Sequence, residues 1–358
     1  MPDIASLVAG LGGMAQKRQL VARGARDYDL TMAVRRGEVV RARQGWYTTL
    51  PEADPAVRAV RVGGRLTGIS AVVAAGGWAL GAFPLHVSVH DNAARLRSPG
   101  NRFVKLAARR VKNLRMHWDD ADVAARGSAT SVDLRDALVR VVLDEQFETA
   151  VAALDWALHT GAIDETDFDR ILQHLPENRR AIADWVDARC ESLPESLART
   201  RLRLLGYRVD IQVRLNGYER IDLVVDDCVG METDGRAYHL ETFEQDRRKD
   251  LDITIADMHP LRPSATMVFH HWPHVLLAVE RAIAARAPAA APGFDAAPAP
   301  AVDAIGNSGK PVARPRKPPL FPPRSAWRAT ANPEFPKPPG GIAGARGNRD
   351  GGAALASG

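Results

Sequence analysis

Apolar positions recur with a helical period in the first part of this chain and change to a strand period before residue 50. Two runs, Ile4–Leu11 and Met14–Arg23, are apolar at helical spacing, and a third helix is expected from Asp27 to Gly37. Short β-type runs then flank Gln44-Gly45, which predicts a hairpin. Residues 1–50 are therefore predicted to form a small unit of three helices and a hairpin.

The order helix, helix, helix, basic hairpin is that of a winged helix-turn-helix, in which the third helix enters a major groove and the hairpin follows the backbone. Four cations stand where they can meet phosphates or bases: Arg35, Arg36, Arg41 and Arg43. DNA is accordingly the predicted partner of this unit. The alternative is a packing module whose arginines are merely solvated.

The central part of the chain changes from a mixed to a helical pattern. Residues 51–130 predict a helix near Ser70–Ala75 and strands near His86–His90 and Leu114–Trp118, and we find no catalytic constellation among them. In residues 131–190 apolar positions recur at helical spacing, which predicts a helical segment. Both segments are interpreted as scaffold.

Residues 191–284 carry the polar pattern that points to chemistry. Ser192-Leu-Pro-Glu195 is a capping box that opens a helix. Two strands follow, Ile221–Val225 and Val229–Asp234, with Asp226-Asp227-Cys228 between them. The odd positions 221 to 233 are largely apolar and are predicted to face a core, whereas the even positions Asp222, Glu232 and Asp234 share the opposite face.

The three-residue loop sets a register that places Asp222 directly across from Glu232, with Cβ atoms about 5 Å apart. Two like charges in that position cost stability, and a divalent cation that prefers carboxylate oxygens reverses the sign of the interaction. Downstream stand a histidine for proton transfer and cations for phosphate: His239, Arg247, Arg248 and Lys249. These residues predict a phosphodiesterase site. The alternatives are an edge hairpin with solvent-facing acids, and a salt-bridged helix over 241–252.

Three motifs here resemble those of a known family: Arg220-Ile-Asp222, Met231-Glu-Thr-Asp-Gly-Arg-Ala-Tyr-His239 and Phe243-Glu-Gln-Asp-Arg-Arg-Lys-Asp250. Together with Glu195-Ser-Leu-Ala-Arg199 they look like an actinobacterial domain of unknown function related to very-short-patch-repair (Vsr) endonucleases, in the PD-(D/E)XK nuclease superfamily. The first fifty residues are similar to the winged helix of AbiEi-type antitoxins. The resemblance spans about 1–50 and 130–284.

The resemblance implies roles for particular residues. Asp222 matches the metal-binding aspartate of the superfamily and Glu232 its second acid, with Mg²⁺ or Mn²⁺ as the implied cofactor. Glu195 matches a helix glutamate that reaches the metal, although it is equally a helix cap. His239 matches a catalytic histidine of Vsr-like nucleases. Asp234, a further implied metal ligand, stands where the motif lysine is expected, so either His239 does the proton work, Lys249 reaches in from the next helix, or the fold does not cleave.

Composition adds limits to this interpretation. Of 358 residues 46% are hydrophobic and 25% charged, which excludes a wholly disordered or collagen-like chain. Only Cys190 and Cys228 are present, so a disulfide framework is excluded and a reducing cytoplasm is expected. No basic segment followed by an apolar core opens the chain, which argues against a secretory signal. The uncharged run Ile69–Leu85 is rich in Ala and Gly and is interpreted as packing in a soluble domain rather than a membrane span.

The last seventy residues differ from the rest. Residues 289–358 hold 13 of the 24 prolines and carry nine basic against four acidic residues, so the whole excess of positive charge lies there. This composition predicts a disordered basic tail, which either adds nonspecific phosphate affinity, binds a proline-recognising module, or is simply solvated.

The sequence as a whole predicts a multidomain α+β protein. Its parts are a winged helix (1–50), a mixed linker domain (51–130), a helical segment (131–190), a restriction-endonuclease-like domain with a small mixed sheet (191–284) and the tail. The expected function is that of a DNA-binding protein with a Mg²⁺-dependent endonuclease domain. The alternatives are a non-catalytic antitoxin-like regulator and a partner of a toxin or defence protein, and the oligomeric state stays open.

Overall fold

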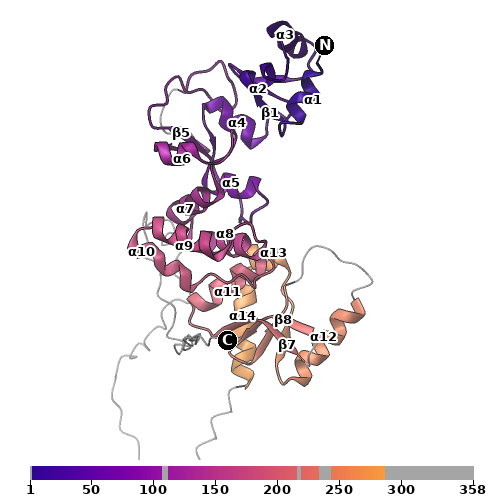
Figure 1. Cartoon of the computed structure of the whole chain (residues 1–358). Coiled ribbons are helices and arrows are strands. Elements are labelled where there is room, and N and C mark those ends of the chain that lie inside the picture. Colours follow the sequence, from indigo (N-terminus) through magenta and orange to yellow (C-terminus); the bar gives the residue numbers. More distant parts are fainter. Residues whose placement is uncertain (1, 107–111, 216–218, 234–242, 287–358) are drawn as a thin grey trace, which may run out of the picture.

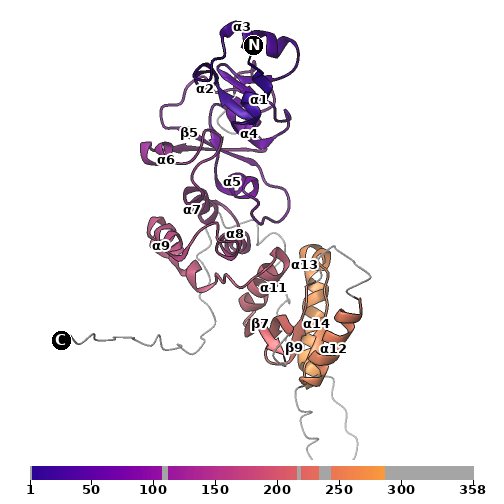
Figure 2. The same ribbon diagram turned by 45° about the vertical axis from the view of Figure 1, so that its right-hand side comes forward.

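The computed structural model describes residues 2–106, 112–215, 219–233 and 243–286, and it is a mixed α/β protein with three small sheets. Three parts follow one another in chain order along the molecule in both views (Figures 1 and 2). The tail predicted for 289–358 lies outside the described residues.

The N-terminal part has helix and hairpin elements around a three-stranded antiparallel sheet of order β1-β3-β2. Its elements are α1 (Ile4–Ala9), β1 (Met14–Gln16), α2 (Lys17–Val21), α3 (Asp27–Arg35), β2 (Val40–Arg43) and β3 (Trp46–Thr48). The three predicted helices and the hairpin are therefore present, with one strand added.

The prediction of a helix from Met14 was wrong for its first turn, because Met14–Gln16 is a strand that pairs with β3. Gly12 and Gly13 both have positive φ, 81° and 80°, and reverse the chain after α1. The side chain of Thr48 then donates a hydrogen bond of 2.6 Å to the carbonyl of Gly13. Long-range pairing of this kind overrides local helical spacing in so short a segment.

The central part combines a small sheet with a stack of helices. Its first elements are α4 (Pro55–Val62), β4 (Arg65–Leu66), α5 (Gly68–Ala74), β5 (Leu85–His90), β6 (Leu114–Asp119) and α6 (Ala121–Ala125). The helices that follow are α7 (Leu134–Asp144), α8 (Phe147–His159), α9 (Glu165–His174), α10 (Glu177–Arg180) and the 3-10 turn η1 (Ala181–Asp184). The sheet order is β4-β5-β6, with β5 and β6 parallel. The predicted strands and the helical segment are confirmed.

One hydrophobic cluster holds the central part together. It runs from Ala59 in α4 through Val87 in β5 and Leu138 in α7 to Trp185, and these four residues are all buried. The mixed segment and the helical segment of the sequence thus share a core, and this common core fixes β5 and β6 relative to α7 and α8.

The C-terminal part is built on a four-stranded sheet of order β10-β9-β8-β7, in which β10 is parallel to β9 and the other pairs are antiparallel. Its elements are α11 (Leu193–Leu204), β7 (Val209–Leu215), β8 (Glu219–Val225), β9 (Val229–Met231), α12 (Phe243–Ile255), β10 (His259–Leu261), α13 (Ala265–His270) and α14 (Trp272–Arg286). A parallel pair needs a crossover, and α12 lies in the connection between β9 and β10.

The two faces of this sheet pack against different helices. Leu223 and Met231 belong to a cluster with Leu197 of α11 and Val279 of α14. On the other side Ile253 of α12 packs with residues of β7 and β8. The sheet is therefore covered on both faces, and the helix before it and the helix after β9 lie on opposite sides.

A buried ion pair joins the central and C-terminal parts. The Asp155 carboxylate of α8 is 0% exposed and accepts a 2.7 Å bond from the Arg199 guanidinium of α11, which is 2% exposed. Ser196 also donates to Asp155, at 2.6 Å, and the backbone N–H of Asp187 donates at 2.7 Å. Asp155 thus accepts from two side chains of α11 and from the backbone of the segment before it.

In the described part of the chain, we find no helix with the length and hydropathy that a bilayer crossing requires. The only regular structure in the uncharged run Ile69–Leu85 is α5 from its second residue onward and the first residue of β5. Ile69, Ala71, Val72 and Leu85 of this run are buried in the central core, whereas residues 73–76 are exposed.

We expect Asp155→Ala to lower the free energy of unfolding by about 3–5 kcal/mol, because it leaves the Arg199 charge buried without its partner. The measurement is urea denaturation followed by tryptophan fluorescence, with Asp169→Ala, an exposed aspartate on α9, as the matched control. The control should change stability by less than about 1 kcal/mol. A loss of similar size in both variants would contradict the role of the pair.

Candidate functional site

The first residues of α11 fix the Glu195 carboxylate. Ser192 is the N-cap, and its hydroxyl both accepts from the Glu195 N–H at 3.4 Å and donates to Glu195 Oε1 at 2.7 Å. The N–H of Glu191 donates to Oε2 at 3.0 Å. The predicted capping role is confirmed, and the side chain is only 6% exposed.

The β8–β9 hairpin has the register that the sequence predicts. Asp226 and Asp227 have φ values of 48° and 54°, and the Cys228 N–H donates to the Val225 carbonyl at 2.9 Å, as in a tight primed turn. The pairs Val225↔Val229 and Leu223↔Met231 follow from this turn. Continued by one residue, the register sets Asp222 opposite Glu232.

Hydrogen bonds across the hairpin link each of these two acids to the chain segment that carries the other. The Asp222 N–H donates to Glu232 Oε1 at 3.1 Å. In return Asp222 Oδ2 accepts from the Thr233 N–H at 2.9 Å and from its hydroxyl at 3.4 Å. Thr233, assigned from its parity to the core face, is thus turned toward the carboxylates, because its hydroxyl finds an acceptor there.

The strict alternation predicted for β8 breaks at Asp222. Leu223 packs on the α11 side of the sheet, whereas Ile221, of the same parity, packs with Val224 on the α12 side. Gln212, which stands across from Asp222 between two regular pairs, has a φ of 53°, and its amide donates to Glu195 Oε2 at 3.2 Å. A non-glycine residue in this region stores about 1–2 kcal/mol, and such strain collects at functional sites.

Helix α12 brings an ammonium group to the same place. Lys249 Nζ forms an ion pair and hydrogen bond with Glu232 Oε2. One turn further along, Ile253 packs over Gly230 of β9, where an added Cβ would lie 2.7 Å from the Ile253 side chain. The absence of a side chain at Gly230 therefore lets α12 come close enough for Lys249 to reach Glu232.

Burial raises the pKa of all three acids, and the Asp222 charge adds to this effect at the two glutamates. Burial is the main cause for Glu195, and the nearby Asp222 charge raises its pKa further. Burial also raises the pKa of Asp222, although the Thr233 N–H and Lys249 oppose it. For Glu232, burial and then the Asp222 charge raise the pKa to about 7, against the opposing effect of Lys249. The site therefore holds more negative charge than its own cation neutralises.

The other predicted residues of this region lie in different places. Asp234 and His239 lie outside the described residues, and their roles stay predictions. Arg247 and Arg248 are exposed on α12, next to Lys249. The structure thus brings together Glu195, Asp222, Glu232 and Lys249, and leaves the two arginines on the surface beside them.

The four arginines of the N-terminal part differ in surroundings. Arg35 and Arg36 are exposed at the end of α3, and Arg36 lies 3.7 Å from Glu38. Arg41 is half-buried and donates to the Tyr47 hydroxyl at 3.3 Å. Arg43 donates to three backbone carbonyls, those of residues 61, 62 and 95, at 2.8–3.1 Å. Burial lowers the pKa of Arg43 and its donors are engaged within the chain.

Sequence reasoning missed three groups of side chains. Gln212 lies on β7 and faces Asp222 on the adjacent strand β8. Pairing the two strand sequences in antiparallel register would have revealed it. Thr233 was placed on the wrong face. In the central part, where the sequence indicates no constellation, His86, His117 and Asp144 lie together. No local spacing signals that cluster, because its members come from three separate elements.

No family model matches this chain, and a search of the curated proteins finds no match either. The function therefore has to be argued from the residues and their geometry.

The pKa of Glu232 predicts a pH dependence of stability. Its pKa is raised from 4.5 to about 7 in the folded chain, so between these values the folded state holds a proton that the unfolded state has lost. The free energy of unfolding should thus fall as pH rises through this interval, by up to about 3 kcal/mol. Urea midpoints between pH 5 and 8 measure it.

Glu232→Gln should remove most of that slope, whereas Glu165→Gln, an exposed glutamate on α9, should leave it unchanged. Equal slopes in the wild-type protein and Glu232→Gln would show that Glu232 has an ordinary pKa.

Proposed function

We propose that this protein is a DNA-binding phosphodiesterase of the endonuclease type, with a divalent-metal site in its C-terminal part. The observation that carries the proposal is the contact of Asp222 and Glu232 on the β8–β9 hairpin with each other and of Glu232 with Lys249 of α12, with Glu195 of α11 near enough for the Asp222 charge to raise its pKa. Three carboxylates beside one ammonium are the groups that metal-assisted hydrolysis of a phosphodiester uses.

The charge and donor chemistry of the site fit a hard divalent cation. The buried Glu195 and Glu232 and the half-buried Asp222 stand against one cation, Lys249, and burial is the main cause of the raised pKa of each acid. Carboxylate oxygens are the ligands that Mg²⁺ and Mn²⁺ prefer. We assign Asp222 and Glu232 as the main ligands, and Glu195 as a further acid whose orientation is fixed by its capping bonds.

Each side chain has a distinct proposed part in hydrolysis. The chemistry that the cation supplies when bound is polarisation of the phosphoryl group and easier loss of a proton from water. Lys249 takes the place of the lysine that the motif lacks at Asp234, and its ammonium group stabilises the developing negative charge of the attacking oxygen. Arg247 and Arg248, exposed on the same helix, orient the phosphate backbone.

The N-terminal part supports a winged-helix interpretation. The order of its elements, with a three-stranded sheet closed by β1, has a helix–helix–hairpin arrangement suited to a DNA groove. Tyr28, Thr31 and Arg35 lie exposed at spacings of three and four on α3, so they share the face that would read base edges. We assign phosphate contacts to Arg36 and Arg41, and a structural role to Arg43.

We expect cleavage of plasmid, single-stranded or mismatched DNA in Mg²⁺ or Mn²⁺, and none in EDTA. Asp222→Ala and Glu232→Ala should abolish it, because each removes a cation ligand. Lys249→Met should lower kcat about 10²–10³-fold, the usual loss for one charge-stabilising group. Gel assays under single-turnover conditions measure these rates.

Lys112→Met, at an exposed lysine before β6, is the matched control and should keep full activity. Metal-dependent cleavage that survives in Asp222→Ala would refute the site. Absence of cleavage from every substrate, with DNA binding retained, would favour the non-catalytic regulator.

Replacing Arg35 and Arg36 by alanine should weaken duplex binding and reduce the slope of log Kd against log salt by about 1, for the phosphate contact assigned to Arg36. Fluorescence anisotropy over a range of salt concentrations measures both quantities. Arg170→Ala, an exposed arginine on α9, is the control and should leave affinity and slope unchanged. An unchanged slope in the double variant would place the DNA surface elsewhere.

A further inference from the structure

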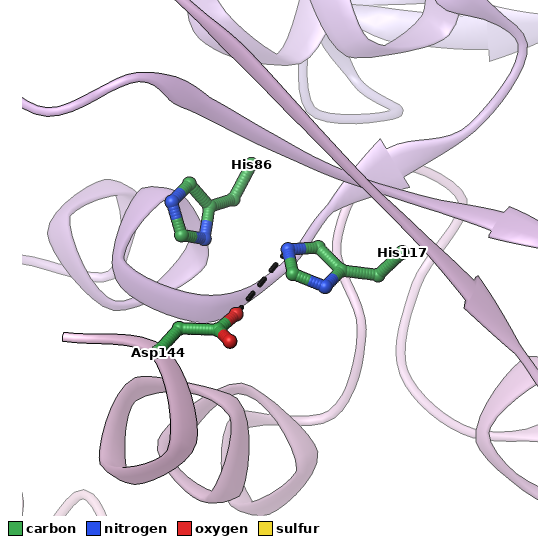
Figure 3. A group of neighbouring side chains, drawn as sticks. All are labelled: His86, His117 and Asp144. Atoms are coloured by element: carbon green, nitrogen blue, oxygen red, sulfur yellow. Dashed lines mark ion pairs between the residues drawn. The ribbon is translucent and has the colours of Figure 1, made fainter. Parts of the chain in front are cut away.

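Two histidines and an aspartate meet in the central part, away from the carboxylates described above. His86 lies on β5, His117 on the adjacent strand β6, and Asp144 is the last residue of α7. One ligand atom from each lies within 4.8 Å of the others, and Figure 3 shows the three side chains converging on one point between the strands and the helix. Both imidazoles are buried, 1% and 8% exposed.

The polar atoms at this point lack hydrogen-bond partners. Both ring nitrogens of His86, Nε2 of His117 and Oδ2 of Asp144 are buried without one, and so is Oε1 of the neighbouring Glu145. Buried polar groups are nearly always paired, and several orphans at one point call for an explanation such as an ion. The imidazole nitrogens and carboxylate oxygens approach one another to 3.4–3.5 Å without hydrogen-bond geometry, which is an arrangement suited to a cation between them.

Two interatomic distances distinguish the atoms available to an ion from the contact that orients a histidine ring. His117 Nε2 lies 3.5 Å from Asp144 Oδ2, which is close to the separation of two ligands around a small tetrahedral ion. His86 Nε2 lies 3.4 Å from Glu145 Oε1, so Nδ1 is the His86 atom left for an ion. In Figure 3 a ring nitrogen of His86 is turned toward His117 and Asp144. A carboxylate behind a ligating histidine orients the ring and strengthens it as a ligand.

The backbone leaves room beside that nitrogen. Gly68 begins α5 with a φ of 51°, and a Cβ added there would lie 2.8 Å from His86 Nδ1. A side chain at this position would therefore crowd the proposed ligand atom, and the glycine keeps the space free.

The protonation states suit metal binding. Burial, with the charges of Arg115 and Arg140, lowers the pKa of His86 to about 4. Burial, Arg140, His86 and Arg115 lower the pKa of His117 to about 3, so both rings are neutral at pH 7. The two arginines also oppose a cation, but Arg115 donates to the Asp144 carbonyl at 3.2 Å and Arg140 lies 4.0 Å from Asp119. Their charges favour the ionised form of Asp144, although burial is the larger effect and raises the pKa of its carboxyl group.

We propose that His86, His117 and Asp144 bind a divalent transition-metal ion of the zinc type, with Glu145 positioning His86. Two imidazoles and one carboxylate are a ligand set for Zn²⁺ or a related ion rather than for Mg²⁺. The ion links β5 and β6 to the end of α7, and so stabilises the central part. This inference does not rest on the nuclease proposal, since the two sites share no residue.

The test uses the untagged full chain carrying Asp222→Asn, so that the carboxylate site contributes less to metal uptake. After EDTA treatment and dialysis, the protein is titrated with Zn²⁺ and, for its visible absorption, with Co²⁺. We expect one ion per chain and a rise in Tm of about 5–10 °C at saturating Zn²⁺. In the same background His117→Gln and Asp144→Asn should lose both effects while keeping the circular dichroism of the parent.

His90→Gln, an exposed histidine on the same strand β5, is the matched control and should bind and gain Tm like the parent. Gly68→Ala should weaken Zn²⁺ binding without removing any ligand. Uptake and Tm gain that persist in a folded His117→Gln protein would place the ion elsewhere and overturn the proposal. The absence of Zn²⁺ and Co²⁺ binding to the folded parent would overturn it as well.

Discussion

The buried ion pair between Asp155 and Arg199 is the constraint on which the candidate nuclease site depends. Helix α11 carries Arg199 and, one turn earlier, Glu195, so the contact that fixes the helix to the central part also fixes the glutamate. Two other donors complete the bonding of Asp155, although burial remains the larger effect and still raises the pKa of its carboxyl group. Because α11 also packs on the sheet, the carboxylate of Glu195 is held against the hairpin that carries the other two acids.

The acidic site lowers the stability of the fold around it. Three carboxylates are buried together, a backbone residue opposite them is in the left-handed region, and one lysine is spent on a single acid. The side-chain alternation of β8 also fails at Asp222. Proteins tolerate such departures where the surrounding packing is strong and function benefits, and the two hydrophobic clusters flanking the sheet supply that packing here.

The structural features that the sequence predicts correctly are those governed by short-range rules. The register of Asp222 against Glu232 was predictable because strands have a period of two and the loop is short, and the cap at Glu195 because its motif is local. The sequence could not predict the strand pairing of Met14–Gln16 or the hydrogen bonds from Arg43 to distant carbonyls. Each depends on segments that only folding brings together. The position of Lys249 was foreseen only as one of three alternatives. His86, His117 and Asp144 gave no signal, because 31 and 27 positions separate them and no motif constrains such distances.

The two proposed cation sites are connected through the same core. Asp144 ends α7, and α8, which carries Asp155, begins three residues later and shares the central hydrophobic cluster. An ion that ties the end of α7 to β5 and β6 would therefore restrict the element from which Asp155 reaches α11. The two sites would bind different metals, because imidazole ligands favour a zinc-type ion and three carboxylates favour Mg²⁺ or Mn²⁺. With an ion bound, the central part would act as a metal-stabilised support, and the geometry of Glu195 is linked to it through one ion pair rather than through the N-terminal part.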